Sequence, residues 1–550
     1  MSNSERTLSL AEASPQTGAE AGLWWGAFGV VLLVVLAPLL VTDIPPLLDY
    51  PNHLARMGLL SGGLQDPILG RMYTVSWGIQ PNIGLDLVVP LLTKVLPLAV
   101  AGKVFVGLAL ILPIVGAVAL QAAMFHRRSY WPLAAALVAY NVPFLAGFVN
   151  FLVGAGLGLL AGALFVRQRG RAVPLRLGWA ALFAVLIFFC HIFAFAFFVL
   201  LLASIELAWP GRLSLRLARL GWLVVPLAAP ALLFLSAPLR HAAPGVGGAG
   251  IVQALRLYYW ALASEPLHMK LLGAVGPFLT YDWRLDGVTL ALTVFALGSW
   301  AVRGKLAVAP AAAIAFTVMV VAYPLTPLVM MDAAWVDQRE PILAAILLFA
   351  GIAPIRLERA EARRWAMVFA VVILAKMASV GVAWADHDTD LADLRRVIAA
   401  VQPGERVLVV RPRDHITPDV AAAEPAARHL LIDVDALTHL PSLIVLERRG
   451  FIPLLFTDPL KQPLRVLPPY DRLSYFDGAP PFAGALAQPS ETDLQRAPYL
   501  VHWRDDFEWV LLLRPHDLPD AERFLPDQLK LEASGEIAAL YRVRPATKAP

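Results

Sequence analysis

Asp49 is the residue that its sequence neighbours place best for acid–base chemistry. Three prolines around it (Pro45, Pro46 and Pro51) hold the backbone extended and then allow a helix to begin at about residue 52. Asp49 therefore precedes a predicted helix, and His53 lies one turn inside it. An N-cap aspartate followed by an interfacial histidine would have the same sequence pattern.

The predicted helix after Asp49 has one apolar side. Leu54, Met57, Leu59 and Leu60 recur at spacings that suit a helix lying along a membrane surface. We therefore expect Asp49 and its neighbouring histidine to lie close together at the outer face of a membrane.

Arg339 is a candidate for holding an anion. It follows Asp337 in a polar segment, residues 332–340, and Pro341 then opens an apolar stretch. A guanidinium at that depth can make a two-pronged contact with a phosphate at the level of lipid headgroups, with Asp337 orienting it. The same two residues would also suit an exposed ion pair at the start of a helix.

Lys376 is a second cationic candidate, because it lies near the middle of the last apolar segment. At 1.5 Å per residue it is about 12 Å from the outer end of that segment. An ammonium group in hydrocarbon is costly, so we expect it to face a cavity, a carboxylate or an anionic ligand. Snorkelling to the surface or a structural partner would satisfy it equally well.

Two further outer segments carry hydrogen-bonding side chains. Residues 239–286 combine a glycine-rich stretch, 245–250, with aromatic and polar residues that suit either a sugar or the membrane interface. These residues are Tyr258, Tyr259, Trp260, Glu265, His268, Lys270, Tyr281, Asp282, Trp283, Arg284 and Asp286. His191, beside the lone Cys190, falls at the outer break of a helical hairpin predicted over 177–209.

Several well-known reaction centres are absent from the sequence. One cysteine excludes an internal disulfide and any cysteine-based metal site. No His-x-x-x-His, glycine-rich phosphate loop or Gly-x-Ser-x-Gly element occurs. We therefore predict no metal-binding residues, and we leave open a divalent cation as a cofactor.

The elements that must position these residues are membrane spans. Of the 550 residues, 58% are hydrophobic and 16% are charged, and the mean hydropathy is +0.65. We expect about eleven transmembrane helices, several of them shorter than the ~20 residues that cross hydrocarbon alone. Their predicted ranges are 23–42, 103–124, 131–142, 145–166, 177–190, 192–209, 219–238, 287–302, 306–328, 341–356 and 365–384.

The charges of the loops predict which side of the membrane each loop faces. Fifteen arginines and lysines within 36 positions gather in the loops 126–130, 167–176, 211–219, 303–305 and 356–364. The alternate segments hold seven within 115 positions. By the positive-inside rule the first set is cytoplasmic. The net charge of +4 therefore reports orientation, and we expect no nucleic-acid partner.

The chain divides into three predicted parts. Residues 1–21 are polar and lack a cleavage site, so we interpret them as a disordered cytoplasmic tail. Residues 22–385 form the transmembrane domain, whose first outer loop covers 43–85. Residues 386–550 are charged and proline-rich, which predicts an α/β or α+β domain on the outer, periplasmic side. In that domain we expect helices at 390–401 and 436–448, and strands at 405–411, 452–456, 508–513 and 538–543.

The order of elements across residues 23–550 resembles the GT-C superfamily of polyprenyl-phosphate-dependent glycosyltransferases. The most local likeness is the LDYPNHL stretch at residues 48–54, since an Asp-x-Pro-x-His pattern follows the first span in several GT-C-like bacterial membrane proteins. The GFVNF stretch at residues 147–151 resembles the same chains. The sequence departs from the family because no Asp-Asp or Asp-Glu pair follows the first span.

The resemblance implies an inverting glycosyltransferase of the bacterial inner membrane. Such an enzyme takes a sugar from a polyprenyl-phosphate carrier to an envelope glycan or lipid acceptor. Asp49 would be the general base or the acceptor-positioning carboxylate, with Asp43 as the nearby alternative and His53 beside it. The cations available to hold the phosphate are Arg339, Lys376 and Arg284, and further substrate contacts are expected from Asp337, His191 and Asn150.

Two other classes of protein stay open on the sequence alone. In a lipid or glycan transporter or flippase, the intramembrane charge and the broken helices would line a pathway, although we find no convincing inverted repeat. In a non-catalytic scaffold for envelope assembly, the outer domain would bind partner proteins.

Overall fold

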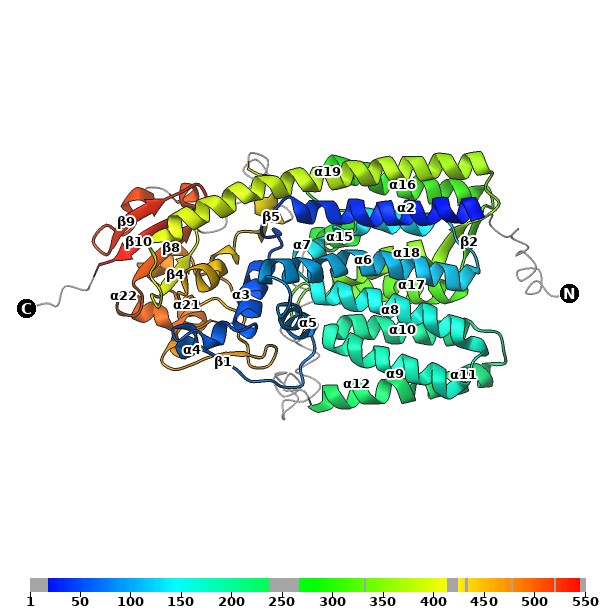
Figure 1. Ribbon diagram of the computed structural model, residues 1–550, viewed down its shortest axis with the longest axis horizontal. Coiled ribbons are helices and arrows are strands. Elements are labelled where there is room, and N and C mark those ends of the chain that lie inside the picture. Colours follow the sequence, from blue (N-terminus) through cyan, green and yellow to red (C-terminus); the bar gives the residue numbers. More distant parts are fainter. Residues whose placement is uncertain are drawn as a thin grey trace, which may run out of the picture.

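The computed structural model describes residues 18–236, 267–330, 333–412, 424–430, 434–475, 478–518 and 521–544. They form an elongated molecule with a helical bundle at one end and a smaller domain that carries the main sheet at the other (Figure 1). Several residues named above lie outside the described ranges: residues 1–17 of the predicted tail, the stretch 245–250, Tyr258, Tyr259, Trp260 and Glu265.

Apolar helices make up the bundle. They are α2 (Gly18–Leu36), α6 (Leu98–Phe125), α8 (Val149–Arg167), α9 (Val173–Cys190), α10 (Ile192–Ala208), α11 (Leu213–Trp222), α12 (Val224–Ser236), α15 (Leu267–Val275), α16 (Trp283–Val302), α17 (Pro310–Ala322), α18 (Arg339–Gly351) and α19 (Arg359–Val397). Six described helices are long and apolar enough to cross a membrane, and α11 with α12 forms a seventh candidate that bends by 42°. The chain is a multi-pass membrane protein. The count of eleven spans stays a prediction, because α10, α17 and α18 have only 17, 13 and 13 residues.

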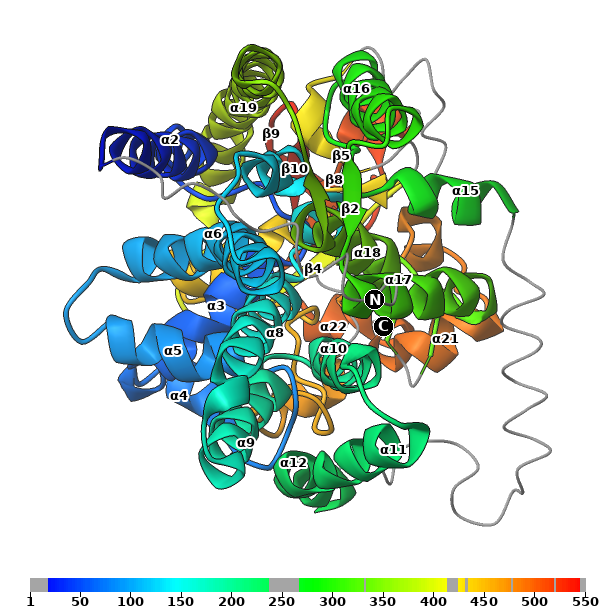
Figure 2. The same cartoon turned by 90° about the vertical axis from the view of Figure 1, so that its right-hand side faces the viewer.

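The helix α8 lies near the centre of the bundle, with α6, α9 and α10 around it (Figure 2). Small residues allow this close packing. A Cβ on Gly156 would meet the backbone of Leu112 in α6 at 2.5 Å, and a Cβ on Gly154 would meet Ala194 in α10 at 2.7 Å.

The segment predicted as a span over 131–142 crosses the bundle without forming a continuous α-helix. It consists of a 3-10 helix, Trp131–Val138, followed by the four-residue α7 (Val142–Leu145). Every residue from 131 to 147 is buried. Irregular backbone of this kind is tolerated at membrane depth only where protein covers it, so its burial explains how the segment can cross.

The loops of the bundle gather at two opposite ends. At the end away from the sheet, β2 (Leu306–Val308) pairs antiparallel with β3 (Ile352–Pro354), and Trp24 Nε1 donates to Ser129 O at 2.9 Å. At the other end, the hydroxyl of Thr42 donates to Asp388 at 2.7 Å. The alternation of arginine-rich and arginine-poor loops thus corresponds to two faces of the bundle.

The helix α19 runs without a break from the bundle into the C-terminal domain (Figure 1). The predicted domain boundary at residue 386 therefore lies inside a helix. The change of composition does not end the helix, because residues 386–397 contain neither glycine nor proline. Leu391 and Leu394 also keep an apolar side that is almost fully buried.

A mixed four-stranded sheet in the order β4-β8-β10-β9 forms the centre of the C-terminal domain. Its strands are β4 (Val407–Val410), β8 (Trp509–Leu513), β10 (Ala538–Val543) and β9 (Leu529–Ser534). Only β4 and β8 are parallel neighbours. Three of the four predicted strands are therefore present.

Two predicted elements of the C-terminal domain are wrong. Residues 452–456 form a buried loop rather than a strand. Residues 436–448 contain a short 3-10 helix, Leu440–Ser442, and a π-helical segment, Ile444–Arg448, rather than one α-helix. Pro453 and Pro441 lack the N–H groups that a regular strand or helix interior needs.

The first outer loop lies between the bundle and the C-terminal domain. It contains α3 (Tyr50–Leu60), α4 (Leu69–Met72), β1 (Tyr73–Val75) and α5 (Gly84–Leu92). The prediction that α3 lies on a membrane surface is wrong, since Leu54, Met57 and Leu59 are at most 4% exposed. Protein rather than lipid covers its apolar side.

Contacts with the C-terminal domain hold this loop in place. The side chain of Asn52 donates to Leu454 O at 2.7 Å and accepts from the N–H of Phe456 at 2.9 Å. The strand β1 pairs antiparallel with β7 (Leu464–Val466). The buried loop at 452–456 is thus part of the interface with α3.

Candidate functional site

Asp49 lies at the junction of the bundle, the first outer loop and the C-terminal domain. Its N–H donates to Ala146 O at 3.1 Å, and the N–H of Leu48 donates to Leu145 O at 2.9 Å. Gly147, with a φ of +92°, packs against it, because a Cβ there would lie 2.9 Å from the Cβ of Asp49. The LDYPNHL and GFVNF stretches, far apart in sequence, therefore meet at this carboxylate.

The carboxylate of Asp49 is mostly withdrawn from water. Its side chain is 21% exposed. Burial raises the pKa of Asp49 to about 7, while the positive charges of Arg339 and Arg56 oppose that rise. A carboxylate with such a pKa is partly ionised at neutral pH and can accept a proton from a bound hydroxyl.

His439 brings the C-terminal domain into contact with Asp49. Its Nε2 lies 3.5 Å from Oδ1 of Asp49. Burial lowers the pKa of His439 to about 4, so the ring is neutral at pH 7 and can donate one N–H. The ring packs edge-on against Phe456 at 5.0 Å, and a Cβ on Gly478 would meet it at 2.6 Å. Nothing in the local sequence distinguishes this histidine, so only the fold reveals it.

His53 lies beside this group without contacting the carboxylate. Its ring packs against the same Phe456 at 5.5 Å, and its backbone N–H donates to Asp49 O at 3.0 Å. Burial, together with the charge of Arg56 and the neighbouring His439, lowers the pKa of His53 well below its usual value. A neutral imidazole with an unpartnered, buried Nδ1 is thus available next to the site.

Arg339 approaches the site from the N-terminal end of α18. Its guanidinium stacks on Phe148 at 4.3 Å and lies 5.5 Å from the ring of Phe193. One amino group donates to the carbonyl oxygens of Ala334 and Trp335 at 2.9 and 2.7 Å, and Nε is buried without a partner. Among the described residues no carboxylate forms an ion pair with it, so its charge is available to an anion.

A buried ion pair joins Arg56 to Asp86 within the first outer loop, and the sequence pattern does not predict it. Two aligned contacts of 2.6 and 3.1 Å join α3 to α5, and neither side chain is more than 2% exposed. The second amino group of Arg56 is buried without a partner. Its one sequence signal is an arginine between two apolar residues, Ala55 and Met57.

Asn150 and His191 organise the backbone around the site. The amide of Asn150 accepts from the N–H of Leu85 at 2.8 Å and donates to Asn82 O at 2.9 Å. His191 caps α10, since its Nδ1 accepts from the N–H of Phe193 at 3.1 Å. Asn150 therefore has a positioning role, and His191 caps the first turn of α10, which carries Phe193, one of the rings near Arg339.

Two crystal structures of ArnT from Cupriavidus metallidurans are similar to this chain. The apo structure matches with a TM-score of 0.50 and 15% identity, over 95% of this chain and 98% of ArnT. The structure bound to undecaprenyl phosphate matches with a TM-score of 0.46 and 15% identity, over 97% and 100%. The chain has the ArnT fold. The predicted polytopic helical membrane architecture is thereby confirmed, whereas no family model and no curated protein matches the sequence.

Two acidic residues that were predicted for the site, Asp43 and Asp337, are paired with cations outside it. Asp43 is 51% exposed and contacts Arg395 of α19 at 2.6 Å. Asp337 accepts from the ammonium of Lys270 at 3.0 Å and does not bond to Arg339. Each carboxylate is thus paired with a cation of another helix, Arg395 of α19 or Lys270 of α15.

Two predicted cations also lie apart from Asp49. Lys376 contacts Asp286 at 2.9 Å inside the bundle, where neither side chain is more than 2% exposed. Arg284 is exposed at the start of α16 and stacks on Trp283 at 5.4 Å. The expectation that Lys376 faces a carboxylate is met. The positive charges that act on Asp49 are those of Arg339 and Arg56.

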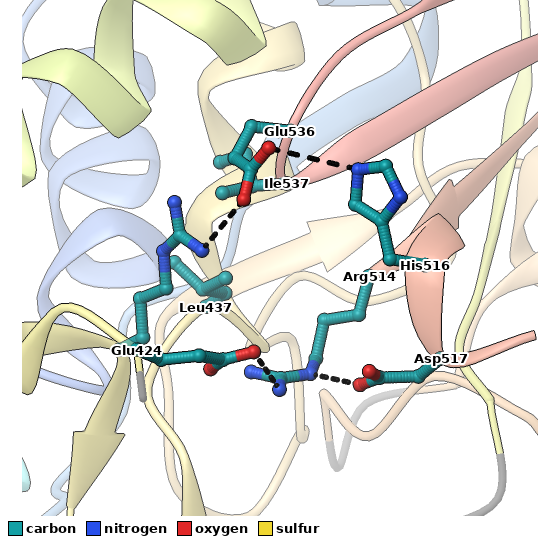
Figure 3. A pocket seen from close by; sticks show the side chains of 8 residues that line it. Glu424, Leu437, Arg514, His516, Asp517, Glu536 and Ile537 are labelled. Carbon is teal, nitrogen blue, oxygen red and sulfur yellow. Dashed lines mark hydrogen bonds and ion pairs between the residues drawn. The ribbon is translucent and has the colours of Figure 1, made fainter. Parts of the chain in front are cut away.

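No group of three or more metal-ligating side chains occurs among the described residues. A second concentration of charge lies in the C-terminal domain, around a cavity of about 120 Å³ (Figure 3). There Arg428 contacts Asp390 at 2.7 Å and Glu536 at 3.4 Å. Arg514 contacts Glu424 and Asp517, both at 2.6 Å. These charges neutralise one another within the domain.

Proposed function

We propose that the chain is a membrane glycosyltransferase that moves a sugar from a polyprenyl-phosphate carrier to a hydroxyl of an envelope glycan or lipid. The observation that carries the proposal is the carboxylate of Asp49, with a pKa near 7, beside the guanidinium of Arg339, which forms no ion pair with any described carboxylate. The two lie where the bundle of an ArnT fold meets its outer domain. This is the depth at which a lipid-linked phosphate and a soluble acceptor can meet.

The reaction is a direct displacement at the anomeric carbon. Asp49 takes the proton of the acceptor hydroxyl while the hydroxyl oxygen attacks that carbon. The bond between the carbon and the phosphate oxygen breaks, and the polyprenyl phosphate leaves with the electron pair. Arg339 stabilises the negative charge that develops on the phosphate. The configuration at the anomeric carbon is inverted.

Neighbouring residues keep this arrangement in place. Asn150 holds the end of the first outer loop, and Gly147 allows the close approach of Asp49. His439 offers a neutral ring N–H toward the carboxylate, which favours its ionised form. The outer domain thus contributes a side chain to the proposed reaction centre.

The carrier and the orientation follow from the same proposal. ArnT has been crystallised with undecaprenyl phosphate, so this lipid is the first carrier to test. The arginine-rich loops assign their end of the bundle to the cytoplasm of the bacterial inner membrane. The N-terminus is then cytoplasmic, and the C-terminal domain is periplasmic. The divalent cation stays a prediction, which an assay with and without EDTA tests.

The test compares envelope glycans of cells that carry the wild-type chain or Asp49→Asn. We expect the variant to insert into the membrane and fold normally but to lose one sugar modification. If carrier-linked sugar instead accumulates on the cytoplasmic side, the chain is a transporter. If Asp49→Asn leaves the glycans unchanged while deletion of the chain alters them, Asp49 has no catalytic role.

A further inference from the structure

Three arginines converge at the end of the bundle opposite Asp49. Arg169 lies in the 3-10 turn that follows α8, Arg176 in the first turn of α9, and Arg219 in α11. Both Arg176 and Arg219 lie close enough to Arg169 to act on it electrostatically. With 19 residues, α8 separates this end from the proposed reaction centre by about 28 Å.

The cluster of Arg169, Arg176 and Arg219 is short of negative charge. Between residues 167 and 219 the chain has seven arginines, no lysine and a single acidic residue, Glu206. The carboxylate of Glu206 is 1% exposed and lies 2.9 Å from Arg169 and 3.5 Å from Arg176. One carboxylate cannot neutralise three guanidinium groups, so the cluster keeps a net positive charge beside a low-dielectric bundle.

The arginines are held in place before any ligand binds. The guanidinium of Arg169 stacks on Trp209 at 4.4 Å, and that of Arg176 stacks on Phe165 at 4.6 Å. Stacking of this kind reduces the conformational freedom that binding would otherwise remove.

Hydrogen-bond donors of the cluster also lack partners. The Nε atoms of Arg169 and Arg176 and one amino group of Arg219 are buried and have no hydrogen-bond acceptor in the described part of the chain. Neither carboxylate oxygen of Glu206 accepts a hydrogen bond of suitable geometry from these arginine donors. Buried donors of charged groups are rarely left unsatisfied, so an acceptor-rich group is missing here.

The neighbouring helix places this cluster at the surface of the bilayer. The helix α11 carries Leu213, Leu215 and Trp222 as exposed apolar residues and meets α12 at a bend of 42°. An amphipathic helix of this composition lies in the membrane interface, at the depth of phospholipid phosphates.

We propose that Arg169, Arg176 and Arg219 form a binding site for the phosphate of an anionic phospholipid. A phosphate supplies both the negative charge and the acceptor oxygens that the cluster lacks. A basic pocket between transmembrane helices at the level of the headgroups is a recurrent form of lipid site. This site is separate from the proposed transfer reaction and does not depend on it.

The test uses the purified full-length chain in detergent. Thermal unfolding is measured with added phosphatidylglycerol, phosphatidylcholine or inorganic phosphate, and bound lipid is counted by native mass spectrometry. We expect phosphatidylglycerol to raise the unfolding temperature and to stay bound, with little effect of phosphatidylcholine. Equal effects of the two lipids would overturn the proposal. A response to inorganic phosphate as large as that to phosphatidylglycerol would show a site for free anions and would overturn the assignment to a lipid.

Variants of the cluster locate the site. The double change Arg169→Gln with Arg176→Gln should weaken binding of phosphatidylglycerol about tenfold or more, as loss of two charged contacts predicts. Arg171→Gln, an exposed residue of the same loop, is the matched control and should bind as the wild type does. Since the double variant can fail to fold, Glu206→Gln provides a second measurement: it removes the competing carboxylate and should strengthen binding. Unchanged or weaker binding by a folded Glu206→Gln variant would contradict the proposal.

Discussion

Two groups of charged residues in this molecule are organised in opposite ways. In the C-terminal domain, Arg428 and Arg514 each contact two carboxylates, so the charges close into a network (Figure 3). At the junction with the bundle, Asp49 and Arg339 act on each other electrostatically, yet no direct ion pair joins them. Each arginine of the first group is paired with carboxylates, whereas Arg339 in the second group has no carboxylate partner among the described residues.

The difference separates a role in stability from a role in chemistry. In a network of paired charges, removal of one partner leaves an uncompensated buried charge and destabilises the folded domain. A carboxylate and a guanidinium held near each other without pairing cost folding free energy, which is typical of functional sites. Variants of the two groups should therefore affect different measurements.

The largest effect is expected from Asp49→Asn. Loss of the proposed general base should lower transfer by about 10²- to 10⁴-fold, because the amide cannot accept the proton of the acceptor hydroxyl. The rate is measured in membranes that contain the cell's lipid-linked sugars. Asp43→Asn is the matched control, since Asp43 is exposed and paired with Arg395. Equal losses for the two variants would contradict the assignment of Asp49.

The next prediction concerns the paired charges of the C-terminal domain. A change there should alter stability and leave the rate of transfer unchanged. Asp390→Asn leaves Arg428 buried without its main partner and should lower the free energy of unfolding by about 3 kcal/mol. Denaturant unfolding of the full chain in detergent measures the change. Glu536→Gln is the control: its side chain is 63% exposed, so the loss should stay below about 1 kcal/mol. A fall in transfer per folded molecule for Asp390→Asn would remove the distinction between the two groups.

Arg339→Gln should act on transfer in a way that the network variants do not. Without the guanidinium, the leaving phosphate loses its charged contact, and the rate should fall about 10²-fold. Arg284→Gln should have no effect, because Arg284 is exposed and away from Asp49. Kinetics with a carrier-linked donor separate the two results. An unchanged rate for Arg339→Gln would mean that another group holds the phosphate.

The fold could be predicted from the sequence to a large extent, because its signals are local. Apolar segments and arginine-rich loops follow the chain in order and predict the bundle and its two faces. The predictions failed where tertiary contacts override local pattern. The apolar side of α3 is covered by protein instead of lipid, and α19 passes through the change in composition at residue 386.

The site could be predicted only in part. The sequence identified Asp49 and Arg339, since unusual polar residues beside spans are visible in a linear pattern. It also identified Lys376 and Asp337 as residues that need partners, but not that Asp286 and Lys270 would provide them. His439 could not be found, because its contact with Asp49 joins a loop after the first span to the C-terminal domain. No local spacing records a contact of that kind.

The smallest effect is expected from His439 and is visible in the pH profile. Transfer should fall as the pH drops through about 7, because the carboxylate of Asp49 is then protonated and cannot act as a base. His439→Phe keeps a ring in the space beside Gly478 but removes the N–H that favours the ionised carboxylate. The midpoint of the profile should therefore rise, by up to about one pH unit. His439→Gln retains a donor and should stay near the wild-type midpoint. A residue that only fills space would lower the rate at every pH equally and leave the midpoint where it was, so the direction of this shift decides whether the C-terminal domain takes part in the chemistry.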